Sequence, residues 1–395
     1  MPIYDYFVIG GGMTADAALH GIREADSDGT IGVVGSESHP PYDRPPLSKA
    51  LWKGEPESAI WRETEGTGAV LHLGRRIQGI DLQNKSVIDD QGAVYGYGKL
   101  LIATGGAPRR LGGSGERILT YRTLDDYHRL RDLAEEPVRF VVVGGGFIAM
   151  EIAAALRMHG REVVMFVGRD GLGTQLFPPD LSSFLVDYYQ EQGVVVRGGG
   201  HVGLEERGER VAVLHAGADG LEADVAVVGI GIQPNVELAR DAGLEVGDGI
   251  EVDQLLRTSR TDVYAAGDVA SFHQSVLGAR IRVEHEDNAN AMGRAAGLAM
   301  AGEASPYDRL PFFYSDLFDL GFEAVGSVDA RYDTYADWKE PFREGVVYYL
   351  ADNRVRGVLL WNTWGQTDAA RQIIEEARPV TKEGLKGRLP EGESA

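Results

Sequence analysis

Two glycine-rich segments contain the residues whose types and spacing point most directly to chemistry. They read Gly10-x-Gly12-x-x-Ala15 and Gly144-x-Gly146-x-x-Ala149. In such a segment the first glycine permits a tight turn, and the second lets the backbone approach a pyrophosphate. The small third residue lets a helix pack closely on a strand. Each segment lies between an apolar strand and an alanine-rich helix whose N-terminus would stabilise phosphates, so we expect two bound dinucleotides.

The residue after the second strand of such a unit normally offers a carboxylate to the adenosine ribose. After the first segment, Ser36 stands at this place with Glu37 beside it, and its charge favours Glu37. The strand VVMFVGRDG (163–171) offers Arg169 instead, with an acid only at Asp170. Arg169 would pair with the 2′-phosphate of NADPH, so we predict that NADPH is accepted. The alternative is that Arg169 faces solvent while Asp170 binds the ribose of NADH.

The chain contains no cysteine. This excludes a structural disulfide, a cysteine-ligated iron–sulfur cluster and a redox-active dithiol. Electrons handled by this chain must therefore pass through a bound cofactor. The 9 histidines are scattered without metal-ligand spacing, and we predict no metal site.

The length and the charge of the chain limit the number of domains and the kinds of partner that it can have. A chain of 395 residues is long enough for two or three domains. Its 60 acidic residues outnumber 39 basic ones, which disfavours nucleic acid as a partner because phosphate binding needs a basic face. No run of about 18 apolar residues and no signal peptide is visible, so we expect no membrane span and a cytoplasmic location.

Further buried strands end in glycine turns within residues 98–111, 224–235 and 258–270. The last of them breaks at Gly267-Asp268, which puts a carboxylate at the edge of a sheet where ligands bind. Asp268 could instead cap a following helix; the two dinucleotide segments favour a cofactor contact. From about residue 310 the chain changes to alternating, aromatic-rich strands, with LADNRV as a hairpin turn and DAARQIIEEA as a helix.

Through these residues the chain resembles the FAD-dependent pyridine-nucleotide reductases of the glutathione-reductase structural class. It most resembles the branch that holds the flavoprotein reductases of ferredoxins and rubredoxins together with apoptosis-inducing factor. The resemblance covers nearly the whole chain. It rests on HPPYDRPPLSKALW (39–52), KLLIATGGAPR (99–109), GGGFIAMEIA (144–153), GIGIQPN (229–235), YAAGDVA (264–270), VEHEDNANAMGRAAG (283–297) and FFYSDLFDLGFEAVG (312–326).

The resemblance implies an α/β fold with two Rossmann-like nucleotide-binding domains and a C-terminal α+β interface domain. Residues 1–112 and 250–309 would form the FAD domain, residues 113–249 the NAD(P)H domain, and residues 310–395 the C-terminal domain. Relatives of this kind occur as monomers and as homodimers, and the sequence favours neither.

The resemblance also implies roles for individual residues. Lys49 would lie near the flavin N5 and pair with Glu151, in the first turn of the NAD(P)H-domain helix. A lysine there would stabilise the negative charge of the reduced ring, and the carboxylate would offset that lysine in the oxidised state. The alternatives are a solvated helix residue for Lys49 and an ordinary helix acid for Glu151. The catalytic residues would be Lys49, Glu151 and His285.

The expected cofactor contacts divide between the two nucleotides. For FAD they are Gly10, Gly12, Ala15, Ser36, Glu37, Arg44, Lys49, Ala103, Thr104, Gly105, Arg122, Gly267, Asp268, Glu284, His285 and Trp361. For NAD(P)H they are Gly144, Gly146, Phe147, Ile148, Glu151, Arg169 and Gly231. His285 could be structural instead, and Trp361 could be plain core.

Two positions depart from the ferredoxin-reductase pattern, because Glu286 and Tyr314 stand where tryptophan is expected. The electron acceptor is therefore not inherited from the resemblance. We expect hydride transfer from NAD(P)H to FAD and delivery of electrons to a separate acceptor, such as a small iron–sulfur protein. The alternatives are a redox sensor of the apoptosis-inducing-factor type, which turns over slowly and dimerises, and a soluble quinone or small-molecule reductase.

Overall fold

The computed structural model describes residues 1–111, 115–168, 171–215 and 220–389, and it divides into two compact units. The first unit comprises residues 1–44, 56–107 and 233–311, and the second comprises residues 45–55, 108–232 and 312–395. The chain changes from one unit to the other after residues 44, 55, 107, 232 and 311, and two of these changes fall within β7 (Gly106–Pro108) and β16 (Ile232–Pro234). The boundaries of three domains at residues 112, 250 and 310 stay a prediction.

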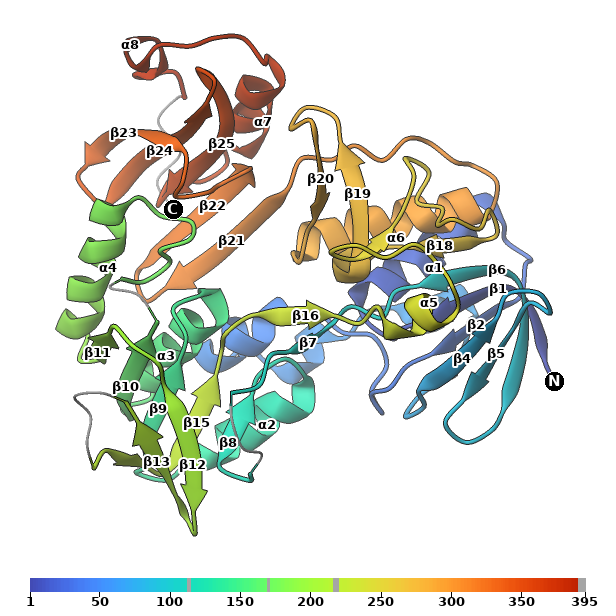
Figure 1. Ribbon diagram of the computed structural model, residues 1–395, viewed down its shortest axis with the longest axis horizontal. Coiled ribbons are helices and arrows are strands. Elements are labelled where there is room, and N and C mark those ends of the chain that lie inside the picture. The colour runs from blue at the N-terminus through green and yellow to red at the C-terminus, as the bar shows by residue number, and fades with distance from the viewer. Residues whose placement is uncertain (112–114, 169–170, 216–219, 390–395) are drawn as a thin grey trace. The chain divides into compact units, whose positions relative to one another are not determined.

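The first unit is built on a seven-stranded sheet (Figure 1). Strands β3, β2, β1 and β6 are parallel neighbours, β18 pairs with β6 in parallel, and β5 and β4 continue the sheet in antiparallel pairing. These strands are β1 (Ile3–Ile9), β2 (Ile31–Val34), β3 (Val70–His72), β4 (Ile77–Asp81), β5 (Ser86–Asp89), β6 (Val94–Ile102) and β18 (Val263–Ala265).

Helices and a small second sheet complete this unit. Helix α1 (Met13–Ala25) connects β1 to β2 and packs against α6 (Glu286–Met300). The other elements are η3 (Glu57–Ile60), η4 (Thr64–Thr67), α5 (Glu237–Asp241), β17 (Ile250–Glu251), η5 (Gly267–Val269), β19 (Ala270–Gln274) and β20 (Ala279–Arg282).

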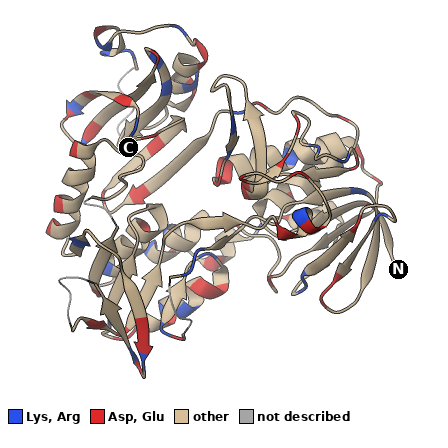
Figure 2. Cartoon of the chain, viewed as in Figure 1, with Lys and Arg blue, Asp and Glu red and all other residues tan. Residues whose placement is uncertain are grey.

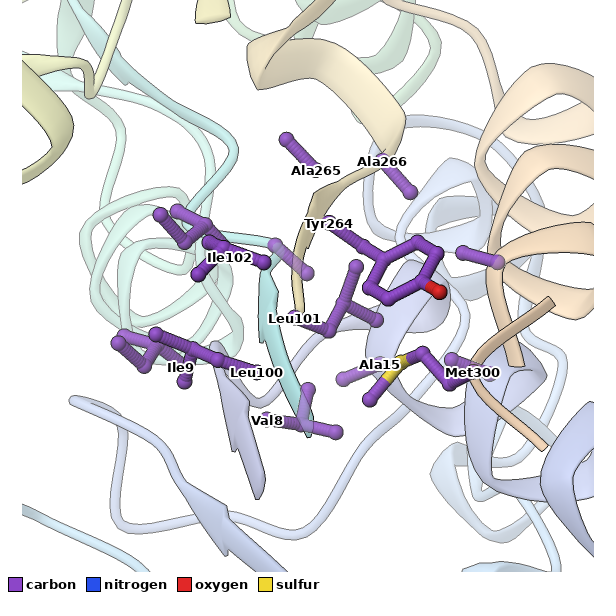
Figure 3. Packing of buried hydrophobic residues seen from close by; sticks show 14 of the residues in the cluster. Val8, Ile9, Ala15, Leu100, Leu101, Ile102, Tyr264, Ala265, Ala266 and Met300 are labelled. Carbon is purple, nitrogen blue, oxygen red and sulfur yellow. The ribbon is translucent and has the colours of Figure 1, made fainter. Parts of the chain in front are cut away.

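The core of the first unit lies where the parallel strands meet helices α1 and α6 (Figure 3). Val8 on β1 is level with Leu101 on β6, and Leu101 is level with Tyr264 on β18. Val8 and Leu101 have no exposed surface. Burial of an aliphatic side chain of this size contributes about 1.5–3 kcal/mol, so this layer fixes the strand ends that precede the glycine turns.

The second unit contains a five-stranded parallel sheet in the order β11-β10-β9-β15-β8. Helix α3 connects β9 to β10, and α4 connects β10 to β11, which repeats the plan of the first unit. Their bounds are β8 (Ile118–Thr120), α2 (Leu124–Leu133), β9 (Arg139–Val143), α3 (Phe147–Met158), β10 (Glu162–Val167), α4 (Pro179–Glu191), β11 (Val195–Gly198) and β15 (Val225–Val228). A small antiparallel sheet of β12 (Gly203–Arg207), β13 (Arg210–Leu214) and β14 (Glu222–Ala223) precedes β15.

The C-terminal residues form an antiparallel five-stranded sheet in the order β21-β22-β25-β24-β23. The predicted hairpin turn is confirmed, with Asp352 and Asn353 in the left-handed region between β24 and β25. The bounds are β21 (Phe312–Leu317), β22 (Leu320–Gly326), β23 (Asp333–Glu340), β24 (Glu344–Ala351), β25 (Arg354–Trp361), α7 (Thr367–Glu375) and α8 (Lys382–Leu385). The short 3-10 turns η1 (Pro45–Ser48) and η2 (Ala50–Lys53) also belong to this unit.

The α/β class with parallel, Rossmann-like regions and a C-terminal antiparallel sheet agrees with the expectation from the sequence. No helix within the described residues combines the length and apolar character needed to cross a membrane.

Candidate active site

The first glycine turns of the two units have the same geometry. Gly10 and Gly144 have φ angles of 130° and 129°. A Cβ atom at Gly10 would lie 2.1 Å from the carbonyl oxygen of Ala103, and one at Gly144 would lie 2.1 Å from that of Gly229. Both the positive φ and the close approach of a neighbouring strand therefore require glycine.

The second glycine of each turn borders open space. A Cβ atom at Gly146 would meet nothing within 4 Å, and one at Gly12 would meet only the guanidinium of Arg44, at 3.9 Å. These two glycines are the N-caps of α3 and α1, and neither helix start has a side-chain cap. The first backbone N–H groups of both helices are therefore available to a phosphate, as a dinucleotide requires. The third residues, Ala15 and Ala149, are buried as predicted.

The predicted ribose acid of the first unit belongs to a small polar cluster. Glu37 accepts hydrogen bonds from Arg44 Nη2 and from the hydroxyl of Tyr42, each over 2.5 Å, whereas Ser36 is exposed. Burial opposes the charge of Arg44, but Tyr42, Glu37 and Asp268 together raise the pKa of the guanidinium. This cluster puts a cation beside the open N-terminus of α1, where a pyrophosphate would need one.

The predicted FAD-binding segment of residues 103–105 is held by Asn235. The hydroxyl of Thr104 donates to the backbone oxygen of Asn235, whose side-chain amide donates to the oxygen of Thr104. The carbonyl of Gly105, a residue in the left-handed region, accepts from the backbone of Asn235. Ala103 is buried at the end of β6, beside the first glycine turn.

Asp268 lies in the 3-10 turn η5 after Gly267, and strand β19 follows. The alternative of a cap on a following α-helix is therefore wrong. The backbone oxygen of Asp268 accepts from Arg282, which also pairs with the exposed Glu284 over 2.6 Å. Asp268 is half-buried and is one of the acids whose charge acts on Arg44.

His285 is the N-cap of α6 and makes no side-chain cap there. Removal of its ring from water lowers the pKa to about 4, against a smaller opposing effect of Asp268 and Asp287. The imidazole is therefore neutral near pH 7. Glu286, which stands in place of a tryptophan, begins α6.

The second unit holds the predicted NAD(P)H contacts. Phe147 packs against Phe313 and Phe322 of the C-terminal sheet, with ring centroids 5.3 and 5.6 Å apart. Ile148 stays 40% exposed beside Gly146, so it is free to contact a coenzyme. Gly231 has a φ of 91° and follows β15 with open space beside it.

A shallow hollow of about 250 Å³ lies at the end of β10, where the adenosine end of a coenzyme is expected. Asp187 is the acidic residue in its lining, together with Val167, Gly171, Ser183, Val186, Val196 and Gly198. Arg169 and Asp170 lie outside the described residues, so the proposed choice between the coenzymes stays a prediction.

Lys49 and Glu151 form the predicted ion pair, with 2.8 Å between Nζ and Oε1. The side chain of Lys49 is 12% exposed and that of Glu151 is 1% exposed, so Lys49 is not a solvated residue. Glu151 is the fifth residue of α3, so it lies in the second turn of the helix and not in the first. Glu151 also accepts from the hydroxyls of Ser48 and Ser315.

The segment that carries Lys49 is anchored by a buried tryptophan. Trp52 donates its indole N–H to the carbonyl oxygen of Leu47 over 2.9 Å, and the hydroxyl of Tyr121 donates to the same oxygen. Burial raises the pKa of Tyr121, which keeps this hydroxyl protonated as a donor. Arg122 follows Tyr121 and is half-buried, and its backbone N–H donates to Asp126.

Trp361 lies in the core of the C-terminal sheet. It has no exposed surface, its ring stacks on Phe322 at 5.8 Å, and its N–H donates to the oxygen of Phe342. This environment favours the core alternative over a flavin contact. Tyr314 is 37% exposed, and the Nζ of Lys49 lies 5.3 Å from the centre of its ring.

The sequence reasoning missed four polar side chains, namely Tyr42, Ser48, Asn235 and Ser315. All four lie inside motifs that carried the resemblance. Ser315 had a signal of its own, because it stands between Phe313 and Leu317 on the inward-facing side of β21, where an apolar residue is expected. Among the described residues, no group of three His, Cys, Asp or Glu side chains could hold a metal ion.

Comparison of the chain with known protein families gives two matches. The profile of the family described as "Pyridine nucleotide-disulphide oxidoreductase" matches residues 4–293, and that of "Apoptosis-inducing factor, mitochondrion-associated, C-term" matches residues 334–376. The chain is 34% identical to the mitochondrial apoptosis-inducing factor 1 of Dictyostelium discoideum, over 95% of this chain and 79% of that protein.

Two further similarities cover almost the full length of both compared chains. The chain is 34% identical to the 5,5′-dehydrodivanillate O-demethylase ferredoxin reductase subunit of Sphingobium sp., over 98% of this chain and 96% of that protein. It superimposes on the reductase fold in the covalent putidaredoxin reductase–putidaredoxin complex with a TM-score of 0.89 and 29% identity, over 96% of this chain and 95% of that one.

Proposed function

We propose that this chain, which belongs to the pyridine nucleotide-disulphide oxidoreductase family, passes electrons to a small iron–sulfur protein of the ferredoxin type. As a member of this family it is an FAD-dependent NAD(P)H oxidoreductase. The family name refers to a disulphide, but this chain has no cysteine. Electrons therefore leave the bound cofactor directly for a separate acceptor. The similarity to a ferredoxin reductase subunit over nearly the whole length of both chains supports an acceptor of this class.

The buried Lys49–Glu151 pair is the observation that carries the proposal. Bound FAD supplies the chemistry, because it accepts a hydride and can release the two electrons singly. The chain supplies position and charge: the open N-termini of α1 and α3 receive phosphates, and Lys49 offers a buried cation. Such a cation stabilises negative charge most effectively where water is excluded.

Charge on the protein gives the proposal a further consequence. Acidic residues outnumber basic ones by 60 to 39 and lie on elements of both units (Figure 2). An acidic acceptor would therefore approach against the overall field, and dissolved salt would screen that repulsion. We expect the rate of acceptor reduction to rise with ionic strength for an acidic ferredoxin and to fall for a basic acceptor.

The test uses the purified holoprotein. Bound FAD should be reduced by NADH or NADPH without oxygen, and the reduced protein should then be mixed with a [2Fe–2S] ferredoxin, rubredoxin, ferricyanide or a water-soluble quinone. The proposal expects ferredoxin to reoxidise the flavin on the time scale of turnover. Reoxidation by the quinone with none by either iron–sulfur protein would contradict it and favour the quinone-reductase alternative.

A second candidate function is redox sensing of the apoptosis-inducing-factor type. It is favoured by the C-terminal family match over β23, β24, β25 and α7, and by the 34% identity to an apoptosis-inducing factor. This function predicts slow reoxidation in air, a long-wavelength absorption band after NADH is added, and a change from monomer to dimer in size-exclusion chromatography. Rapid reoxidation with an unchanged elution volume would exclude it. The cytoplasmic location inferred from the sequence stays a prediction.

A further inference from the structure

The carboxylate of Glu151 contacts three side chains that come from two separate segments of the second unit, residues 45–55 and strand β21. Its Oε2 accepts from Ser48 Oγ over 2.5 Å, and its Oε1 accepts from Ser315 Oγ over 2.6 Å. Oε1 also pairs with Lys49 Nζ over 2.8 Å. Both oxygens are thus satisfied by hydroxyl groups in addition to the lysine.

The two serines are not explained by the fold alone. Ser315 has no exposed surface and lies on the inward row of β21 with Phe313 and Leu317, where an apolar side chain would add burial. Ser48 is 6% exposed at the end of η1, directly before Lys49. A buried hydroxyl costs free energy unless it is hydrogen-bonded, and the carboxylate of Glu151 is the acceptor of both.

A buried carboxylate held only by Lys49 would make the ammonium difficult to remove. Taking one partner from a buried ion pair leaves an uncompensated charge, which is strongly unfavourable. Hydroxyl donors on both oxygens reduce that penalty, because the carboxylate stays hydrogen-bonded when the lysine turns away. The Nζ of Lys49 also lies 5.3 Å from the centre of the Tyr314 ring while it pairs with Glu151, so the carboxylate is not the sole favourable contact of the ammonium.

We propose that Ser48 and Ser315 are positioning residues that hold the Glu151 carboxylate and share its negative charge, so that Lys49 is free to stabilise the reduced flavin. This inference rests on the proposed function, in which Lys49 serves the cofactor. Without the two hydroxyls, Glu151 holds Lys49 more tightly and the reduced form loses part of its cation. The midpoint potential of bound FAD then becomes more negative.

The sign of the change in potential distinguishes this role from a structural one. Ser48→Ala and Ser315→Ala should each make flavin reduction less favourable by up to about tenfold, which is about 30 mV for a two-electron couple. Lys49→Met should shift the potential in the same direction. Glu151→Gln should shift it in the opposite direction, because the lysine is then released from its counter-ion. Ser48→Thr retains a hydroxyl and should restore the wild-type potential.

Ser182→Ala is the matched control, because Ser182 is a buried serine of the same unit whose hydroxyl donates to the backbone oxygen of Leu172. It should lower Tm by an amount similar to the other serine variants and leave the potential unchanged. If Ser48→Ala and Ser315→Ala also change Tm alone, the inference is overturned while the proposed function stands. If the wild-type protein binds no FAD, or its FAD is not reduced by NADH or NADPH, the proposed function itself fails.

Discussion

Arg44 and Glu37 form an ion pair in the first unit, with 2.5 Å between Nη2 and Oε1. The guanidinium also lies 3.9 Å from the position that a Cβ atom would occupy at Gly12. One side chain thus connects the predicted ribose acid to the open N-terminus of α1. Because Arg44 is 21% exposed, a phosphate bound at that helix end would meet a partly desolvated cation.

We therefore predict that Arg44→Met weakens FAD binding. Loss of a hydrogen bond to a charged group costs about 1.5–3 kcal/mol, which raises the dissociation constant about 10- to 100-fold. The measurement is the FAD dissociation constant from fluorescence recovery on dilution. Arg294→Met is the control, since Arg294 forms an exposed pair with Glu24 in the same unit. Equal FAD affinities of Arg44→Met and the wild type would contradict the prediction.

The two glycines that flank Gly145 should separate folding from coenzyme binding. Gly144→Ala meets a carbonyl oxygen at 2.1 Å with φ at 129°, so strain and overlap together destabilise the second unit by about 2–6 kcal/mol. Gly146→Ala meets nothing within 4 Å, and stability should change by less than about 1 kcal/mol at an N-cap.

The Cβ atom of Gly146→Ala nevertheless occupies the space where a pyrophosphate would approach the backbone. The Kd for NADH should therefore rise about tenfold or more, with Tm almost unchanged. Urea unfolding and coenzyme titration of both variants provide the comparison. A Gly146→Ala protein that binds NADH as tightly as the wild type would show that the coenzyme does not use this turn.

The glycine turns were predictable from the sequence because the backbone alone enforces them. Gly10 and Gly144 need a positive φ, and the spacing to Ala15 and Ala149 follows from the packing of one helix on one strand. The pairing of Lys49 with Glu151 was accessible only through the resemblance, since 102 positions of chain separate the two residues and no local pattern connects them.

The donors around Glu151 could not be derived from local patterns. Ser48 and Ser315 come from different elements, and their contact depends on how η1, α3 and β21 pack together. For Trp361, in contrast, the local pattern was visible but fitted two different roles. An aromatic residue on an apolar strand fits a core or a cofactor equally well, and only its lack of exposed surface favours the core. Tertiary packing decides such cases, and the sequence encodes it only indirectly.

Arg169 provides the test of coenzyme choice. If it pairs with the 2′-phosphate, Arg169→Glu should lower kcat/KM for NADPH about 10- to 100-fold, because a charge-assisted contact is lost and a repulsive one is gained. The value for NADH should change much less. Arg207→Glu, at an exposed position on β12 of the same unit, is the control for the change in charge. A wild type that uses NADPH only in traces, with an unchanged coenzyme ratio in Arg169→Glu, would favour the alternative in which Asp170 binds the ribose of NADH.

His285 should make the protein less stable as pH falls below neutral. Its folded-state pKa of about 4 lies below the value of about 6.5 expected when unfolded, because burial disfavours the charged ring. Between these values the unfolded chain binds a proton that the folded chain does not, so unfolding becomes easier as pH falls from about 6.5 to about 4. Hydrogen bonds from Arg75 and other donors lower the pKa of Asp89 to about 2, against the effect of burial. The contribution of Asp89 to the free energy of unfolding is therefore lost only at lower pH.

The measurement is the free energy of unfolding of the holoprotein in urea at pH 7 and pH 5, with FAD at a fixed concentration. In the wild type this free energy should be smaller at pH 5, and His285→Gln should remove part of the difference because glutamine does not titrate. His201→Gln replaces an exposed histidine of the second unit and serves as the control. Should His285→Gln keep the full wild-type difference while His201→Gln reduces it, the loss of stability on acidification would have to be assigned to another group.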